Sequence, residues 1–258
     1  MASFVKTERE IELLRECGHR LAHVLDELEK AVRPGVSTKE LDLLAEKLIR
    51  ATGDTPAFLG YQPYGANFPY PGTLCVSVND EIVHGIGKEK HILKEGDIIG
   101  LDLGMVHNGL ITDSARTVAV GKISGPAQKV LDTTKKALEI GINAAIAGAH
   151  SGDIGFAIER FVKPYKYGIV RELGGHGVGR HVHEEPYIPN YGTRKGMGAK
   201  LKPGMVIAIE PMLNIGKRGI VLDKDGYTYR TADRSLSAHF EHTVLITKDG
   251  PEILTKYA

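Results

Sequence analysis

The sequence contains no tryptophan, only two cysteines and no long run of apolar residues. Cys17 and Cys75 are too few for a disulfide framework or for a zinc site built on cysteines. The longest apolar runs, such as Met205 to Ile209, fall far short of a membrane span. The first ten residues become charged at once and lack the apolar core of a secretion signal. We therefore expect a reduced, cytoplasmic protein without a membrane segment.

An excess of charge is also lacking, because the formal net charge is only +1 over 258 residues. This balance gives no electrostatic reason to expect binding to nucleic acid or to an anionic membrane. The composition, 42% hydrophobic and 25% charged, is typical of a soluble globular protein. The length is sufficient for one large domain with an ample core.

Helix patterns and strand patterns follow one another in the same order twice. In the first half, capping boxes at Thr7–Glu10 and Ser37–Glu40 open two helices that end before Arg33 and at Gly53. Strand-like residues then occupy 73–78 and 100–113. In the second half a long helix from 124 to about 147 and a shorter one from 151 to about 164 precede strand-like segments at 168–173, 205–213 and 237–247. We expect a single α+β domain over 1–258, with pseudo-symmetric halves at 7–120 and 124–248.

The segment 100–113 is typical of a β-hairpin with a two-residue turn at Asn108-Gly109. That turn places Asp113 opposite Gly104, which is two residues from Asp102 and therefore shares its face. Asp102 and Asp113 become diagonal neighbours on one surface. Two carboxylates on an apolar hairpin repel each other and are costly to bury, which favours one or two metal ions. The alternative is an edge hairpin whose aspartates face water.

Three further polar residues lie in glycine-rich or apolar surroundings. His176 lies between glycines, while Glu210 and Glu241 lie in apolar strand-like segments. With the two aspartates they form a set of four carboxylates and one imidazole, which suits a pair of divalent cations such as Mn²⁺, Fe²⁺, Co²⁺ or Zn²⁺. Two ions about 3.5–4 Å apart can hold a bridging hydroxide and stabilise the oxyanion of a hydrolysed carbonyl. Each glutamate alone could instead be a strand-end carboxylate that faces water.

This set, taken in order, resembles the five metal ligands of the methionine aminopeptidases, dinuclear hydrolases of the pita-bread fold. The resemblance covers nearly the whole chain, and local motifs carry it as well, namely 175–180 (Gly-His-Gly-Val-Gly-Arg), 209–212 (Ile-Glu-Pro-Met) and 240–243 (Phe-Glu-His-Thr). Residues 233–243 look much like the bacterial type I enzymes. The resemblance therefore implies a pita-bread fold of two pseudo-symmetric halves, with antiparallel strands and outer helices.

The resemblance also implies a reaction, the removal of the initiator methionine from nascent polypeptides with a preference for a small second residue. In this family a metal-bridging hydroxide attacks the scissile carbonyl, and the ligand that matches Glu210 is the general base. His84 matches a histidine near the scissile nitrogen, and His183 matches one that contacts the substrate carbonyl. Without the resemblance, both are more simply read as ordinary loop histidines. We expect two divalent ions per chain, a monomer, at most a transient contact with the ribosome and no requirement for nucleic acid.

By family position, the methionine pocket is expected to include Tyr61, Tyr64, Cys75 and Tyr227, with His84 and His183 at its edge. The sequence departs from the residues that are common in the family at Phe58, Val182 and Tyr227. We expect these departures to leave the metal centre unaffected and to alter the shape of the pocket.

Three other functions compete with this interpretation. A proline-specific peptidase of the same fold usually carries an extra N-terminal domain, for which the early start of the core motifs leaves no room. A non-catalytic binding protein and a metal-free creatinase-like enzyme both predict missing ligands, whereas all five positions are filled.

Overall fold

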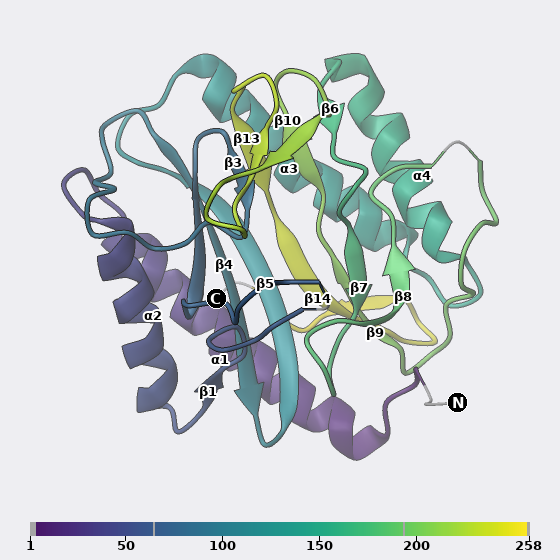
Figure 1. Ribbon diagram of the computed structural model, residues 1–258. Coiled ribbons are helices and arrows are strands. Elements are labelled where there is room, and N and C mark those ends of the chain that lie inside the picture. Colours follow the sequence, from purple (N-terminus) through teal and green to yellow (C-terminus); the bar gives the residue numbers. More distant parts are fainter. Residues whose placement is uncertain (1–3, 64, 193, 257–258) are drawn as a thin grey trace.

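Helices on one side of an antiparallel sheet form the frame of the computed structural model, which describes residues 4–63, 65–192 and 194–256 (Figure 1). The described helices are α1 (Glu8–Ala31), α2 (Thr38–Ala51), α3 (Gly125–Ala144), α4 (Ser151–Val162) and the short 3₁₀ helix η1 (Lys163–Tyr165). None of them combines the length and the apolar run that crossing a bilayer requires.

Local sequence signals account for where these helices begin. Thr7 and Ser37 each accept a hydrogen bond from the backbone three residues on, and the glutamate there bonds back, so both predicted capping boxes are confirmed. The Ser124 side chain caps α3 by accepting a hydrogen bond from the backbone N–H of Ala127, and Pro126 lies in the first turn. The α3 helix ends at Ala144, three residues before the predicted end.

The strands form one large sheet and two small ones. The large sheet runs in the order β1-β4-β5-β14-β9-β7-β8, with β2 also on β4 and β15 also on β14; the small sheets are β13-β10-β6 and β11-β12-β3. The bounds are β1 (Thr55–Pro56), β2 (Leu74–Val78), β3 (Glu81–Val83), β4 (Ile98–His107), β5 (Leu110–Ala119), β6 (Gly168–Ile169), β7 (Gly175–Gly177), β8 (Glu184–Ile188), β9 (Val206–Ile209), β10 (Met212–Asn214), β11 (Ile220–Leu222), β12 (Tyr229–Thr231), β13 (Ser237–His239), β14 (Glu241–Ile246) and β15 (Pro251–Ile253). Strands from both predicted halves thus share the large sheet. That residues 1–258 form one domain of two pseudo-symmetric halves stays a prediction.

Two predicted strands are each divided in the structure. The segment 205–213 splits into β9 and β10 because Pro211 has no N–H to donate, and Glu210 falls in the gap. The segment 237–247 splits at Phe240 into β13 and β14, which belong to different sheets. The strand predicted at 168–173 is present only as the two residues of β6.

Alternation along β4 separates a core face from a site face. Leu101, Leu103 and Met105 are fully buried in the cluster that also contains the apolar faces of α1 and α2. Asp102 lies between them in sequence and therefore points to the opposite face of the sheet. A second cluster joins α3 and α4 to β9 and β14. The helices thus cover one face of the sheet, and the polar residues gather on the other.

Candidate metal centre

The hairpin of β4 and β5 has the register that the sequence predicted. Asn108 and Gly109 form the turn with positive φ values of 49° and 80°, and Gly104 pairs with Asp113. Asp102 pairs with Ala115, two residues beyond Asp113 on the same face. The prediction that both aspartates lie on one surface is confirmed.

The next strand adds a third carboxylate to this surface. Ala115 of β5 pairs with Asp102 on one side and with Glu241 of β14 on the other. Directly paired residues share a face, so the two carboxylates flank the small alanine side chain. Asp113 lies two residues away, which brings three acidic side chains from three adjacent strands together.

His176 reaches the same surface from β7, where close backbone packing requires its glycine neighbours. A Cβ at Gly175 would lie 2.2 Å from the carbonyl oxygen of Ala208, and one at Gly177 would lie 2.3 Å from that of Glu185. The Nδ1 of His176 donates to the carbonyl oxygen of Gly177 at 2.8 Å. Its Nε2 is therefore left as an acceptor, the form that binds a metal ion.

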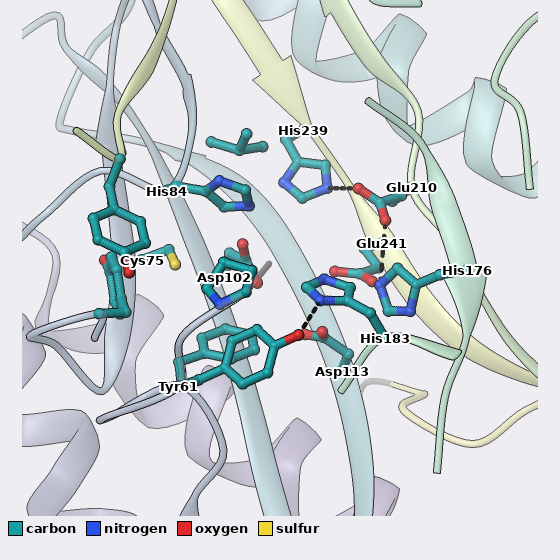
Figure 2. Close-up of a pocket in the computed structure, with 15 residues that line it drawn as sticks. Tyr61, Cys75, His84, Asp102, Asp113, His176, His183, Glu210, His239 and Glu241 are labelled. Atoms are coloured by element: carbon teal, nitrogen blue, oxygen red, sulfur yellow. Dashed lines mark hydrogen bonds and ion pairs between the residues drawn. The ribbon is translucent and has the colours of Figure 1, made fainter. Parts of the chain in front are cut away.

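Glu210 follows β9 and lies between two imidazoles. Its Oε1 is 3.5 Å from Nε2 of His176, and its Oε2 is 3.7 Å from Nε2 of His239. The amide of Asn190 donates to the backbone carbonyl of Glu210 at 2.9 Å and holds the residue in the gap between β9 and β10. Figure 2 shows these side chains converging on one hollow together with the hairpin carboxylates.

Burial strongly disfavours charge on these carboxylates. Desolvation raises the pKa of Asp102 to about 7, and desolvation together with the charge of Asp102 raises the pKa of Glu210 to about 8. Desolvation and the neighbouring carboxylates raise the pKa values of Asp113 and Glu241 well above the usual range. Burial lowers the pKa of His176 to about 3, so its imidazole is neutral. Four acids thus share one site, and a positive charge placed there would stabilise their ionised forms.

The donor atoms fit a divalent cation. Asp113, His176 and Glu241 each offer one ligand atom, and these atoms all lie within 4.8 Å of one another. Oδ1 of Asp113 is buried and has no hydrogen-bond partner among the described residues. An oxygen-rich set with one neutral imidazole suits first-row divalent ions. The structure brings together all five residues that the sequence predicted as ligands.

The two predicted catalytic histidines border this hollow on opposite sides (Figure 2). His84 follows β3 with a positive φ of 57°, an uncommon conformation that turns its ring toward the site. His183 lies just before β8, with its ring centroid 4.5 Å from that of His176. Nδ1 of His183 is 2.8 Å from the hydroxyl oxygen of Tyr61.

A cavity with aromatic walls lies in front of the candidate metal ligands. Its lining comprises Phe58, Tyr61, Pro63, Tyr70, Cys75, Val83, His84, Asp102, Asp113, His176, His183, Glu210, Tyr227, His239 and Glu241. Of the predicted pocket residues, Tyr61, Cys75 and Tyr227 are therefore present, whereas Tyr64 lies outside the described residues. Tyr70 and Tyr227 donate their hydroxyls to the backbone carbonyls of Gly85 and Phe68. Their ring surfaces are left to face the cavity, which makes its wall apolar.

Four residues of the lining were not anticipated from the sequence, namely Pro63, Tyr70, Val83 and His239. His239 is 3% exposed, and its Nε2 has no hydrogen-bond partner within the described part of the chain. Its position two residues before Glu241 could have suggested that it faces the same site. Tyr70 lies in an irregular loop, where the sequence carries no periodic signal for side-chain direction.

Comparison with known proteins gives consistent matches over the whole chain. Residues 12–248 match the model of metallopeptidase family M24. A curated methionine aminopeptidase from Aquifex aeolicus is 48% identical over 99% of this chain and 100% of its own length. The crystal structure of a methionine aminopeptidase from Rickettsia prowazekii superposes with a TM-score of 0.94 at 38% identity, covering 99% of this chain and 100% of that one. A prolidase from Pyrococcus furiosus, with a TM-score of 0.76 at 24% identity over 99% of this chain and 66% of that one, shares the fold.

Proposed function

Since this chain belongs to metallopeptidase family M24, among the methionine aminopeptidases, we propose that divalent metal ions are held by Asp102, Asp113, His176, Glu210 and Glu241. The chain is a metal-dependent aminopeptidase that removes N-terminal methionine, with the pita-bread fold of its relatives. The observation that carries the ligand assignment is the cluster of four buried carboxylates around one neutral imidazole.

The proposed complement is two ions, because the four carboxylates offer more oxygen atoms than one ion needs. Such ions supply Lewis-acid activation of water and of the substrate carbonyl when they are bound. Manganese, iron, cobalt and zinc all suit this ligand set, and cellular availability selects among them. The free α-amine of the substrate would lie against the carboxylates, which restricts cleavage to the first residue.

Three side chains are proposed to handle the proton and the developing charge. Glu210 accepts the proton of the attacking water, a role that its buried position at the cavity edge supports. The proton that Glu210 has taken from the water passes to the leaving nitrogen, beside which His84 is the hydrogen-bond donor, so that the protons balance. His183 donates from Nε2 to the carbonyl oxygen, and the Tyr61 hydroxyl donates to Nδ1 and so selects the tautomer that keeps the proton on Nε2.

The aromatic cavity is proposed to bind the methionine side chain. Phe68 and Tyr70 both meet the ring of Tyr227 edge to face, at centroid distances of 5.2 and 5.1 Å. A wall fixed in this way offers ring surface to a thioether, which makes favourable contacts with aromatic rings. We extend the proposal to a preference for a small second residue.

The cellular setting is also part of the proposal. All five proposed ligands come from one chain, so a monomer suffices for the reaction. Both cysteines are unpaired, which suits the reducing cytoplasm where nascent chains emerge. Contact with the ribosome would be transient, and no nucleic acid is required.

The test is a peptide assay on protein stripped of metal by a chelator. Met-Ala-Ser, Met-Lys-Ser and Ala-Pro-Ala are each incubated before and after Mn²⁺ or Co²⁺ is added back. We expect methionine release from the first peptide alone, only with metal, and nearly lost in Glu210→Gln. Glu139→Gln, on the exposed face of α3, is the matched control. Comparable activity in Glu210→Gln would exclude Glu210 as the base, and cleavage before proline would contradict the specificity.

A further inference from the structure

A short segment before and at the start of α1, residues 5–10, contacts the turn that carries His183. This turn, residues 179–184, links β7 to β8 and has few backbone hydrogen bonds of its own. The segment 5–10 lies far from it in sequence and contributes no residue to the cavity. Two ion pairs nevertheless join them.

The first ion pair is buried. The side chain of Lys6 has no exposed surface, and its Nζ lies 2.5 Å from Oε2 of Glu184. The Lys6 stem packs on the backbone of Gly179, where a Cβ would lie 2.5 Å from Lys6 Cε. The Lys6 backbone N–H donates to the carbonyl oxygen of Gly204 at 2.8 Å, so the lysine itself is firmly anchored.

Glu184 transmits this contact to the turn. Its second oxygen, Oε1, accepts the backbone N–H groups of Arg180 at 2.5 Å and His181 at 2.9 Å. The Glu184 carboxylate thus closes the turn, and His183 is the residue directly before Glu184. Lys6 and these two amides together hold the pKa of Glu184 below its usual range against the opposing effect of burial.

The second ion pair ties the start of the same turn to α1. The guanidinium of Arg180 donates from Nε and Nη2 to the two carboxylate oxygens of Glu10, at 2.7 and 2.8 Å. Glu10 is also the glutamate of the capping box that begins α1. The turn is therefore held at both ends by one segment, residues 5–10.

We infer that Lys6 is a positioning residue for the reaction, which acts through Glu184 to hold His183 against the substrate carbonyl. This inference rests on the proposed role of His183. A misplacement of a charge-stabilising donor by about 1 Å can cost up to about a hundredfold in rate. Loss of the Lys6 contact should therefore lower kcat, because His183 acts on the transition state, and should leave KM nearly unchanged.

The experiment is a double-mutant cycle between Lys6→Met and His183→Ala, assayed with Met-Ala-Ser at saturating Mn²⁺. Methionine keeps most of the stem that packs on Gly179 and removes the charge. We expect Lys6→Met to lower kcat about tenfold or more in the wild-type background and less than about twofold in the His183→Ala background, since residues that act as a unit are not additive. Mn²⁺ stoichiometry, measured by calorimetry, should not change.

Controls separate this role from a loss of stability. Arg15→Met breaks another ion pair of α1, to Glu252, and Val24→Ala weakens the α1 core. Both should leave kcat unchanged at an assay temperature well below their melting temperatures. Where Lys6→Met alone does not fold, Lys6→Met/Glu184→Gln removes both charges together and takes its place in the cycle.

Equal losses of kcat in both backgrounds would overturn the positioning role and leave the proposed role of His183 intact. An unchanged kcat in Lys6→Met would do the same. An unchanged kcat in His183→Ala would instead overturn both the proposed role of His183 and the inference built on it.

Discussion

The carboxylate cluster makes a prediction about stability that needs no substrate. Asp102 and Glu210 have pKa values of about 7 and about 8 in the folded protein, whereas carboxyls in an unfolded chain titrate near 4. Above pH 5 these two carboxyls therefore hold more protons in the folded, metal-free protein than in the unfolded chain. Stability falls with pH wherever the folded state binds more protons, so the metal-free protein should become less stable as the solution becomes more alkaline.

The window from pH 7 to pH 8 isolates this effect. Burial lowers the pKa values of His84, His176, His239 and His242, and these groups change the stability mainly below pH 6.5, where the unfolded chain gains their protons. Between pH 7 and pH 8, deprotonation of Asp102 and Glu210 together should lower the free energy of unfolding by about 1.4 kcal/mol, since one pK unit corresponds to about 1.4 kcal/mol. Desolvation also raises the pKa values of Asp113 and Glu241 well above the usual range, and these groups act in the same direction. Burial also raises the pKa values of Cys17 and Cys75, and their thiols add a few tenths of a kcal/mol in the same direction.

The assay is urea unfolding of chelator-treated protein at pH 7 and pH 8. Asp102→Asn/Glu210→Gln should reduce the difference by about 1.4 kcal/mol, because neither side chain can then titrate. Asp132→Asn/Glu139→Gln, on exposed parts of α3, should leave the difference unchanged. A metal-free protein whose stability is constant or rises between pH 7 and pH 8 would refute the account of the buried carboxylates.

Three further predictions concern single residues. Asp113→Asn should weaken metal binding, measured by titration of Mn²⁺ into the metal-free protein, and an unchanged stoichiometry and affinity would argue against Asp113 as a ligand. Tyr61→Phe removes the donor to Nδ1 of His183 and should lower kcat about tenfold, less than the hundredfold or more that complete loss of an oxyanion donor costs, because His183 itself remains. A kcat equal to that of the unmodified protein would contradict the tautomer argument. Tyr227→Ala opens the aromatic wall and should raise KM for Met-Ala-Ser several-fold more than it lowers kcat, so a selective loss of kcat would place Tyr227 in the chemistry instead.

The strand register of the hairpin could be predicted because it depends on local signals alone. The turn at Asn108-Gly109 fixes the pairing of Gly104 with Asp113, and the period of two then fixes the face of Asp102. Capping boxes fixed the starts of α1 and α2 for the same reason, since each is complete within four residues. The five candidate ligands were conspicuous as polar residues in apolar or glycine-rich segments, and the family resemblance supported them as a set. Beyond the two hairpin aspartates, their convergence became visible only in the structure.

What could not be predicted depends on contacts between distant segments. Alternation along β9 buries Ile207 and Ile209 against α3 and α4 and so directs Glu210 to the other face of the sheet. The break at Pro211 and the approach of Glu210 to within 3.5 Å of His176 depend on other segments and could not be predicted locally. Likewise nothing near His183 in the sequence indicates that Lys6, 178 residues from Glu184, holds its turn. The same reasoning explains why the candidate metal ligands were found from the sequence and the residues proposed to position His183 were not. Ligands are chemically unusual wherever they occur, whereas a lysine becomes informative only once its burial is known.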